Sequence, residues 1–233
     1  MIEHLAWDSE FLGFETAMIQ CENINEIEAW INKARNENYR LLYFFGNDDL
    51  WIDAAILQKN NGKLVDRKVV YELNADTTAI ANFEKTALYT SNAVNHDLQA
   101  LAYESGKYSR FKTDEHFAPQ VFEKMYELWM LNSVNGKMAD AIYSVEENSK
   151  TLAMVTLKAK SDSLHIGLIA TAPQAQGKGY GKQLINRTLQ VAKTMGLSKV
   201  EVPTQYDNKQ ACGFYEACGF KVASIRNIYH FWL

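Results

Sequence analysis

The stretch from Ser163 to Tyr215, "SLHIGLIATAPQAQGKGYGKQLINRTLQVAKTMGLSKVEVPTQYDNKQACGFY", decides the fold of this chain. The apolar run Leu164–Thr171 predicts a strand, which a glycine-rich turn follows. A helix is expected from about Gly179 to Thr194, because apolar residues recur there at helical spacing and a glycine can end it. A second strand, Lys199–Thr204, and a second helix near Lys209 follow. The inward face of the first helix is expected to carry Leu184, Ile185, Leu189, Ala192 and Met195.

Composition places the chain among ordinary globular proteins. Its 233 residues are 47% apolar and 22% charged, which excludes a disordered chain. The net charge of −4, without a stripe of basic residues among aromatics, argues against nucleic acid as a partner. We find no signal peptide or spanning segment, so we expect no membrane partner. Three cysteines without a CxxC pair favour reduced thiols in a cytoplasmic protein, with Cys212 and Cys218 as packing residues.

The first third of the chain predicts a small α/β unit. An amphipathic helix is expected around Asn25–Asn36 and a strand at Leu41–Phe45. An Asn-Gly turn at residues 61–62 precedes alternating residues that end in Val69–Leu73. The composition turns polar around Asn74–Asn82. We therefore predict a small amino-terminal α/β domain at residues 1–76 and a second domain at residues 77–233.

The second part combines a hairpin with a strand–helix–strand unit. Helices are expected at His96–Gly106 and after Pro119, the latter ending at Asn135-Gly136. Ala141–Val145 and Thr151–Lys160 predict a hairpin, and the closing "YHFWL" predicts a last strand. This order indicates an α/β fold, in the α+β sense of a mixed sheet with helices on its faces.

The loop Gln176–Gly181, "QGKGYG", joins the strand to the first helix of the opening stretch. Alternating glycines let backbone amides converge, and the start of a helix adds positive dipole, so the loop suits a di- or triphosphate. It lacks the Lys-Ser/Thr ending of a Walker P-loop, and it lies after antiparallel strands, unlike a dinucleotide-binding loop. By themselves the glycines fit a tight structural turn equally well.

The pattern Gln-x-x-Gly-x-Gly, followed by Asn208 and Tyr215, resembles the GNAT acetyltransferase superfamily. The resemblance covers about the last two-thirds of the chain and implies a GNAT fold, with acetyl-CoA as co-substrate and no metal. Within the superfamily the chain looks most like the dTDP-fucosamine (dTDP-4-amino-4,6-dideoxygalactose) N-acetyltransferase group. That narrower similarity rests on "LAWDSEFLGF" near the amino end, "YSRF" at Tyr108–Phe111, "HIGLIA" and "TQYDN".

The resemblance assigns roles around acetyl-CoA. It implies that the backbone N–H of Ile169 stabilises the oxyanion of acyl transfer. Asn208 would bind the coenzyme arm, although it fits the cap of the following helix equally well. The remaining coenzyme-binding residues are expected to be Ala170 and Thr171 for the pantetheine arm, and Gln176, Gly177, Lys178, Gly179, Tyr180, Gly181 and Lys182 for the pyrophosphate.

Tyr215 is expected to be the general acid, because the family places a tyrosine there to protonate the departing thiolate. The general base stays open. His165, His116 and Glu201 are candidates, but a histidine or glutamate at such places is more often structural or solvated.

For the acceptor amine, we expect Arg110 to bind a diphosphate, because a guanidinium offers two parallel hydrogen bonds. Tyr108, Phe111 and Phe117 could provide faces for a thymine or a sugar ring. The alternative is a loop that packs over the core, with Arg110 in a surface ion pair.

The sequence therefore predicts an N-acetyltransferase that acts on a dTDP-linked amino-deoxy sugar by direct transfer from acetyl-CoA. Neither Cys212 nor Cys218 has a histidine at a spacing that would suit a covalent acyl-enzyme. A GNAT enzyme for another small amine or a protein amino terminus is one alternative, and a non-catalytic acetyl-CoA-binding module is another. The apolar carboxyl end suggests a homodimer without deciding the oligomeric state.

Overall fold

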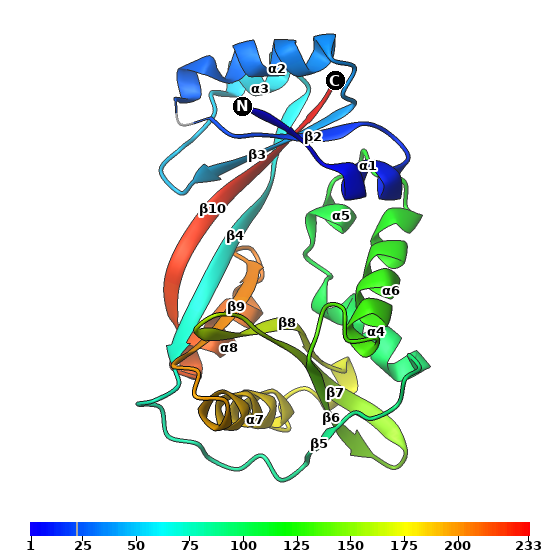
Figure 1. Cartoon of the computed structure of the whole chain (residues 1–233), viewed down its shortest axis with the longest axis vertical. Helices are drawn as coiled ribbons and strands as arrows, with labels where there is room; N and C mark the ends of the chain where they lie inside the picture. Colours follow the sequence, from blue (N-terminus) through cyan, green and yellow to red (C-terminus); the bar gives the residue numbers. More distant parts are fainter. Residues whose placement is uncertain (22) are drawn as a thin grey trace.

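The computed structural model describes residues 1–21 and 23–233, and in these residues ten strands form one mixed sheet with helices on its faces (Figure 1). The predicted fold class is thereby confirmed. The strands, in sheet order, are β1 (Ile2–His4), β2 (Thr16–Ile19), β3 (Leu41–Asn47), β10 (Lys221–Trp232), β4 (Gly62–Asn74), β9 (Lys199–Gln205), β8 (Ser163–Thr171), β7 (Lys150–Ala159), β6 (Ala141–Glu147) and β5 (Thr86–Leu88).

Eight α-helices and two short 3-10 turns complete the described residues. The α-helices are α1 (Ala6–Leu12), α2 (Ile27–Asn36), α3 (Ala54–Lys59), α4 (His96–Ser105), α5 (Arg110–Thr113), α6 (Gln120–Val134), α7 (Tyr180–Thr194) and α8 (Lys209–Ala217); the 3-10 turns are η1 (Ile24–Glu26) and η2 (Pro173–Ala175). None of these helices has the length and apolarity needed to cross a bilayer.

The predicted hairpin is confirmed as β6 and β7, which pair antiparallel around Asn148 and Ser149, both at positive φ. The pairs β2/β3 and β8/β9 are parallel. The expected strands and helices of the opening stretch are all present, so the local periodicity of that stretch sets its elements.

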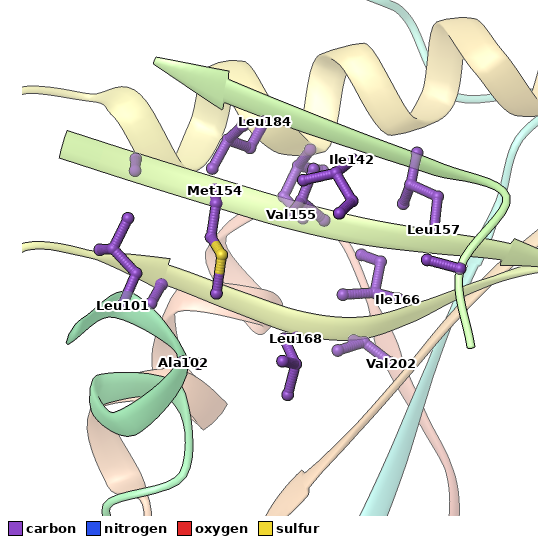
Figure 2. Packing of buried hydrophobic residues seen from close by; sticks show 14 of the residues in the cluster. Leu101, Ala102, Ile142, Met154, Val155, Leu157, Ile166, Leu168, Leu184 and Val202 are labelled. Atoms are coloured by element: carbon purple, nitrogen blue, oxygen red, sulfur yellow. The ribbon is translucent and has the colours of Figure 1, made fainter. Parts of the chain in front are cut away.

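Helices cover both faces of the sheet where β7 and β8 run. α4 packs on one face of these strands and α7 on the other. In Figure 2, Met154 of β7 points toward Leu101 and Ala102 of α4, and Leu184 of α7 lies on the opposite side of the strand. Both faces of β7 are therefore apolar, which explains the continuous apolar run in its sequence.

The apolar face of α7 follows the prediction with one exception. Leu184, Ile185, Leu189 and Ala192 are buried, but Met195 is 51% exposed. The prediction for Met195 was wrong because α7 ends at Thr194, so Met195 lies beyond the last regular turn.

The carboxyl-terminal strand β10 lies inside the sheet rather than at its edge. It pairs with β3 on one side and β4 on the other, and Ile228, Tyr229 and Phe231 are almost fully buried. These apolar residues are covered by the same chain, so they do not offer the exposed surface on which the prediction of a homodimer was based. The boundary predicted between residues 76 and 77 follows the end of β4 and stays a prediction.

A buried carboxylate ties the segment after α5 to β10. Asp114 accepts hydrogen bonds from His230 Nδ1 at 2.6 Å and from Trp232 Nε1 at 3.0 Å, and His116 Nδ1 lies 3.0 Å from its other oxygen. Burial by itself would raise the pKa of Asp114. These hydrogen bonds have the larger combined effect and hold the pKa below the usual range. The network fixes the segment that carries Arg110 against the sheet.

Candidate active site

One cavity of about 600 Å³ opens between β8 and β9 and continues toward β4, α5 and α6. One end is lined mainly by backbone and apolar groups, which belong to Gly167–Thr171, to Val202–Gln205 and to Gln176–Lys182 without Lys178. Charged and aromatic side chains, including Asp66, Lys68, Arg110 and Trp129, line the other end. A single space is thus available for two reactants.

The cavity exists because two parallel strands separate. β8 pairs with β9 only from Ser163↔Lys199 to His165↔Glu201. Beyond His165, β8 keeps its partner β7 but loses β9, and the residues on both sides of the gap line the cavity. The backbone groups of β8 that face β9 are therefore left without strand partners.

The pairing of β8 with β7 identifies which amides face the gap. Ala172 N donates to Leu152 O at 2.8 Å, and hydrogen-bonded pairs alternate along antiparallel strands. Ala170 therefore bonds to β7, whereas the N–H groups of Ile169 and Thr171 point away from β7 toward the cavity. This is the geometry expected of Ile169 as an oxyanion donor, while the amide of Ala170 is used within the sheet.

A bulge in β8 sets this register, and the sequence analysis missed it. Gly167 and Leu168 together oppose Thr156 of β7, and Leu168 N donates to Thr156 Oγ1 at 2.8 Å. A Cβ on Gly167 would lie 2.8 Å from the same oxygen, so any other residue there would force the Thr156 hydroxyl to move. The signal was present in the sequence, because an isolated glycine within a strand often marks a bulge.

The glycine-rich loop has the backbone conformation of an anion site. Gly177 and Gly179 have φ of +78° and +80°, and a Cβ on either would meet no other atom within 4 Å. Glycine is therefore needed for its conformation and not for space. Gly179 caps α7 without any side-chain hydrogen bond, so the first N–H groups of the helix have no partner in the described residues. These features fit a pyrophosphate.

Other side chains of the loop point away from that role. Tyr180 is buried, and its hydroxyl donates to Glu147, which also pairs with Lys85 at 3.1 Å. Lys178 is exposed and does not line the cavity, whereas Lys182 does. Any contribution of Tyr180 to a phosphate must therefore come from its backbone.

Asn208 has the capping role that the sequence analysis considered. Its Oδ1 accepts from Ala211 N at 3.1 Å at the start of α8, and the residue also lines the cavity. Nearby, Gln210 Nε2 donates to Gln176 Oε1 at 3.2 Å. α8 is thus fixed against the loop, beside the space that a coenzyme arm would use.

Tyr215 lines the cavity and is only 4% exposed. Its ring packs against Tyr71 and Phe220, with centroids 5.7 and 5.6 Å away. Burial raises the pKa of its phenol, so the hydroxyl keeps its proton at neutral pH. No described residue forms a hydrogen bond with that hydroxyl. It can therefore serve as a proton donor.

Arg110 lies at the other end of the cavity. Its guanidinium carbon lies 4.9 Å from the Tyr43 ring centroid and 4.7 Å from that of Phe111, and Nε is buried without a hydrogen-bond partner in the described chain. No carboxylate among the described residues lies within ion-pair distance of it. The alternative of a surface ion pair is thus not what the structure has.

The structure places the three aromatic residues predicted around Arg110 in different surroundings. Phe111 is buried and lines the cavity. Tyr108 is exposed and outside the lining, with Lys107 over its ring. Phe117 packs against His230 and Trp232 in the core.

Sequence reasoning missed two charged residues of β4, Asp66 and Lys68, which both line the cavity. Asp66 is 9% exposed, and burial raises its pKa to about 6 although Arg110 and Lys68 oppose the shift. Burial, and next Arg110, lower the pKa of Lys68. Charges within the apolar pattern of residues 64–70 were the available signal.

The three candidates for a base lie outside the cavity lining. His165 Nε2 lies 2.9 Å from Ser163 Oγ and 3.2 Å from Glu201, so these two candidates pair with each other. His116 stacks on Trp232 with centroids 5.2 Å apart and bonds to Asp114. Each therefore has a structural partner.

The acetyltransferase (GNAT) family model matches residues 102–220, half of the chain, and the chain belongs to that family. A curated relative, spore coat polysaccharide biosynthesis protein SpsD of Bacillus subtilis, is 26% identical over 132 residues, which are 57% of this chain and 45% of that protein. The chain spans about half the length of the curated relatives that it matches.

Solved structures share the architecture of nearly the whole chain. A conserved protein of unknown function from Staphylococcus epidermidis aligns with a TM-score of 0.66 at 13% identity, covering 99% of this chain and 90% of its own. A GCN5-related N-acetyltransferase from Sphaerobacter thermophilus aligns with a TM-score of 0.61 at 12% identity, covering 98% and 75%. At these identities the likeness concerns the fold.

Proposed function

We propose that this protein is an acetyl-CoA-dependent N-acetyltransferase that transfers the acetyl group directly to the amine of a nucleotide-linked amino-deoxy sugar. One observation carries the proposal. A single cavity joins the glycine-rich loop, the free amide of Ile169, the phenol of Tyr215 and the unpaired guanidinium of Arg110. Both reactants could meet there in a ternary complex, without a covalent enzyme intermediate.

Acetyl-CoA would supply the activated acetyl group as a thioester. The amides of Gly177–Gly181 and the start of α7 would hold its pyrophosphate, with Lys182 beside them. The free backbone groups of Thr171 and the amide side chain of Asn208 would hold the pantetheine arm. This assignment is supported by the positive φ angles of the loop and by the separation of β8 from β9.

Two groups of the chain would act on the reacting atoms. The N–H of Ile169 would donate to the thioester carbonyl oxygen as negative charge develops on it. The phenol of Tyr215 would give its proton to the departing sulfur. Burial keeps the proton on the Tyr215 oxygen at neutral pH, so the phenol is still protonated when the thiolate departs.

The acceptor assignment rests on charge and on a relative's name. Arg110 and Lys68 line the acceptor end, and no carboxylate of the described residues lies within ion-pair distance of either, which favours an anionic acceptor such as a sugar diphosphate. Phe111 and Trp129 provide apolar surface there. The name of the Bacillus subtilis relative connects that protein with polysaccharide synthesis, which supports a sugar over other amines.

The proposal is tested by binding and by thiol release. Isothermal titration calorimetry should detect acetyl-CoA, and a thiol-release assay should show turnover with dTDP-linked amino sugars. Polyamines and peptides with free amino termini serve as comparison acceptors. Preferred turnover of either would replace the acceptor, tight binding without turnover would indicate a binding module, and no binding at millimolar acetyl-CoA would refute the proposal.

Two predictions from the sequence remain to be tested with the same protein. We infer a cytoplasmic protein from its reduced cysteines, and light scattering would decide between a monomer and a homodimer.

A further inference from the structure

Two carboxylates line the cavity among the described residues, and they differ in their surroundings. Glu104 is paired with Lys107 at 2.7 Å. No side chain among the described residues forms a hydrogen bond or ion pair with Asp66, whose carboxylate interacts with the backbone of Arg67 and is not fully enclosed. Because the residue is 9% exposed and lines the cavity, the exposed surface of its carboxylate belongs to the cavity.

The fold holds Asp66 firmly. It lies in β4, two residues before that strand begins to pair with β9, and it pairs with Ile228 of β10 next to a bulge in the β4–β10 ladder. Arg67, the next residue, anchors the strand by donating to Asn227 Oδ1 at 3.2 Å. A carboxylate on a central strand is positioned more precisely than one on a loop.

Charged and titratable groups act on Asp66 from its own strand, from α5, from α6 and from the turn after β9. Arg110 of α5 and Lys68 of β4 favour its ionised form, whereas Asp207, in the turn after β9, opposes it. The phenol of Tyr126 on α6 also lies within its electrostatic reach. Burial outweighs the two cations and raises the pKa of Asp66 to about 6. At pH 7 the carboxylate is mostly ionised and is a stronger base than an exposed aspartate.

We propose that Asp66 is the general base of this site, receiving the proton of the acceptor ammonium before the amine attacks. The inference rests on the proposed function, because it requires an amine acceptor in the same cavity as Ile169 and Tyr215. It assigns to Asp66 the role that His165, His116 and Glu201 cannot fill from outside the cavity.

The reaction begins with deprotonation of the acceptor and conserves protons and electron pairs throughout. An N–H⁺ bond of the ammonium breaks and its proton moves to Asp66, directly or across a water molecule in the cavity. The freed lone pair forms the N–C bond to the acetyl carbonyl carbon. The C–S bond breaks, its electron pair goes to sulfur, and sulfur takes the phenolic proton of Tyr215. The nitrogen then returns a second proton to the tyrosinate, and Asp66 loses its proton to solvent.

The test uses the full-length chain with Asp66→Asn, which keeps the shape of the side chain and removes its basicity. We expect kcat/KM for the amine to fall about 10²- to 10⁴-fold at pH 7, with the acetyl-CoA Kd within about twofold of wild type. The matched control is Glu72→Gln, on the same strand but outside the cavity and paired with Lys199; we expect it to leave kcat/KM unchanged.

The pH profile separates a base from a structural residue. Wild-type kcat/KM should have an acidic limb near pH 6, and this limb should be absent in Asp66→Asn. The variant should recover part of its loss at high pH, where the acceptor is already a free amine. A loss of equal size at every pH, with a lower melting temperature, would indicate a structural role and overturn the proposal.

Two further measurements apply if Asp66→Asn folds poorly. Added formate should restore part of the activity of Asp66→Ala, since the cavity can admit a small carboxylate. Carbon-13 NMR of labelled aspartates should find one carboxyl of the wild type titrating near pH 6, whatever its activity. If formate restored no activity and no carboxyl titrated near pH 6, the proposal would be overturned.

Failure of the proposed function can be distinguished from failure of the role of Asp66. Wild-type protein that binds no acetyl-CoA, or releases no thiol with any amine, refutes both inferences. An active wild type with an unaltered Asp66→Asn profile refutes only the role of Asp66.

Discussion

The coenzyme end of the cavity is formed by one continuous stretch of chain, whereas the acceptor end is assembled from segments far apart in the sequence. β8, the glycine-rich loop, α7, β9 and α8 all lie between residues 163 and 217. Asp66 and Lys68 come from β4, Arg110 from α5 and Trp129 from α6. The first end presents mainly backbone amides, and the second presents side chains.

This difference predicts how the two ends respond to substitution. Backbone amides keep their positions unless the backbone conformation changes, so the coenzyme end should be sensitive mainly at its glycines. A charged side chain can be removed without moving the backbone, so the acceptor end should be sensitive to single truncations. Variants should therefore separate acetyl-CoA binding from acceptor binding.

Among the variants that compare the two ends, the largest effect is expected at Tyr215, which lines the same cavity. Tyr215→Phe keeps the ring and removes the proton that sulfur needs, so kcat should fall about 10²-fold or more in the thiol-release assay, with acetyl-CoA binding intact. Tyr229→Phe is the control, because it removes a buried hydroxyl that bonds to Ile52 N, away from the cavity. Unchanged kcat in Tyr215→Phe would contradict the acid assignment.

Arg110→Met should affect the acceptor end alone. Loss of charge-assisted hydrogen bonds of about 1.5–3 kcal/mol should raise the acceptor KM about 10- to 100-fold, while calorimetry finds the same acetyl-CoA Kd. Arg110→Lys keeps the charge but not the planar fork, so its acceptor KM should lie between those of wild type and Arg110→Met. A change in acetyl-CoA binding instead would show that the two ends are not separate.

Gly179→Ala should have the reverse selectivity. A non-glycine residue at φ +80° costs about 1–2 kcal/mol, and relief of this strain moves the amides at the start of α7. We expect the acetyl-CoA Kd to rise about 5- to 30-fold and the acceptor KM to change little. Gly213→Ala, inside α8 without positive φ or a nearby atom, is the matched control and should bind normally.

The smallest effect concerns the anchor of the acceptor end, His230. Burial lowers its pKa to about 4, and its Nε2 is enclosed without a hydrogen-bond partner among the described residues. The unfolded chain, with a histidine pKa near 6.5, binds this proton first, so acidification from about pH 6.5 to pH 4 should lower the free energy of unfolding.

Asp66 affects the free energy of unfolding in the opposite direction. Its raised pKa favours protonation of the folded state, so acidification from pH 6 to pH 4 should increase this free energy through Asp66. The effect of His230 is therefore the difference between wild type and His230→Gln in urea denaturation at several pH values. His96→Gln, at an exposed histidine, should follow the wild type. Identical pH dependence in all three proteins would show that His230 does not titrate as inferred.

Much of the coenzyme end could be predicted because its information is local. Apolar periodicity gave β8, α7 and β9, and the alternation of glycines marked the loop. Two consequences could not be derived locally: the side chain of Tyr180 turns to Glu147, and Thr156 of β7 fixes the register of β8. Both depend on β6 and β7, which lie elsewhere in the chain.

The sequence by itself determined the strands and helices of residues 163–217, the fold class and the glycines of the loop that need a special backbone conformation, because these depend on the spacing of apolar residues and on glycine. Only the tertiary structure decided that β10 enters the sheet between β3 and β4. It also decided that Asp66, Lys68 and Arg110 line one cavity. The reason is physical: the charge state and the partners of a side chain depend on what is buried around it, and distant segments supply those surroundings.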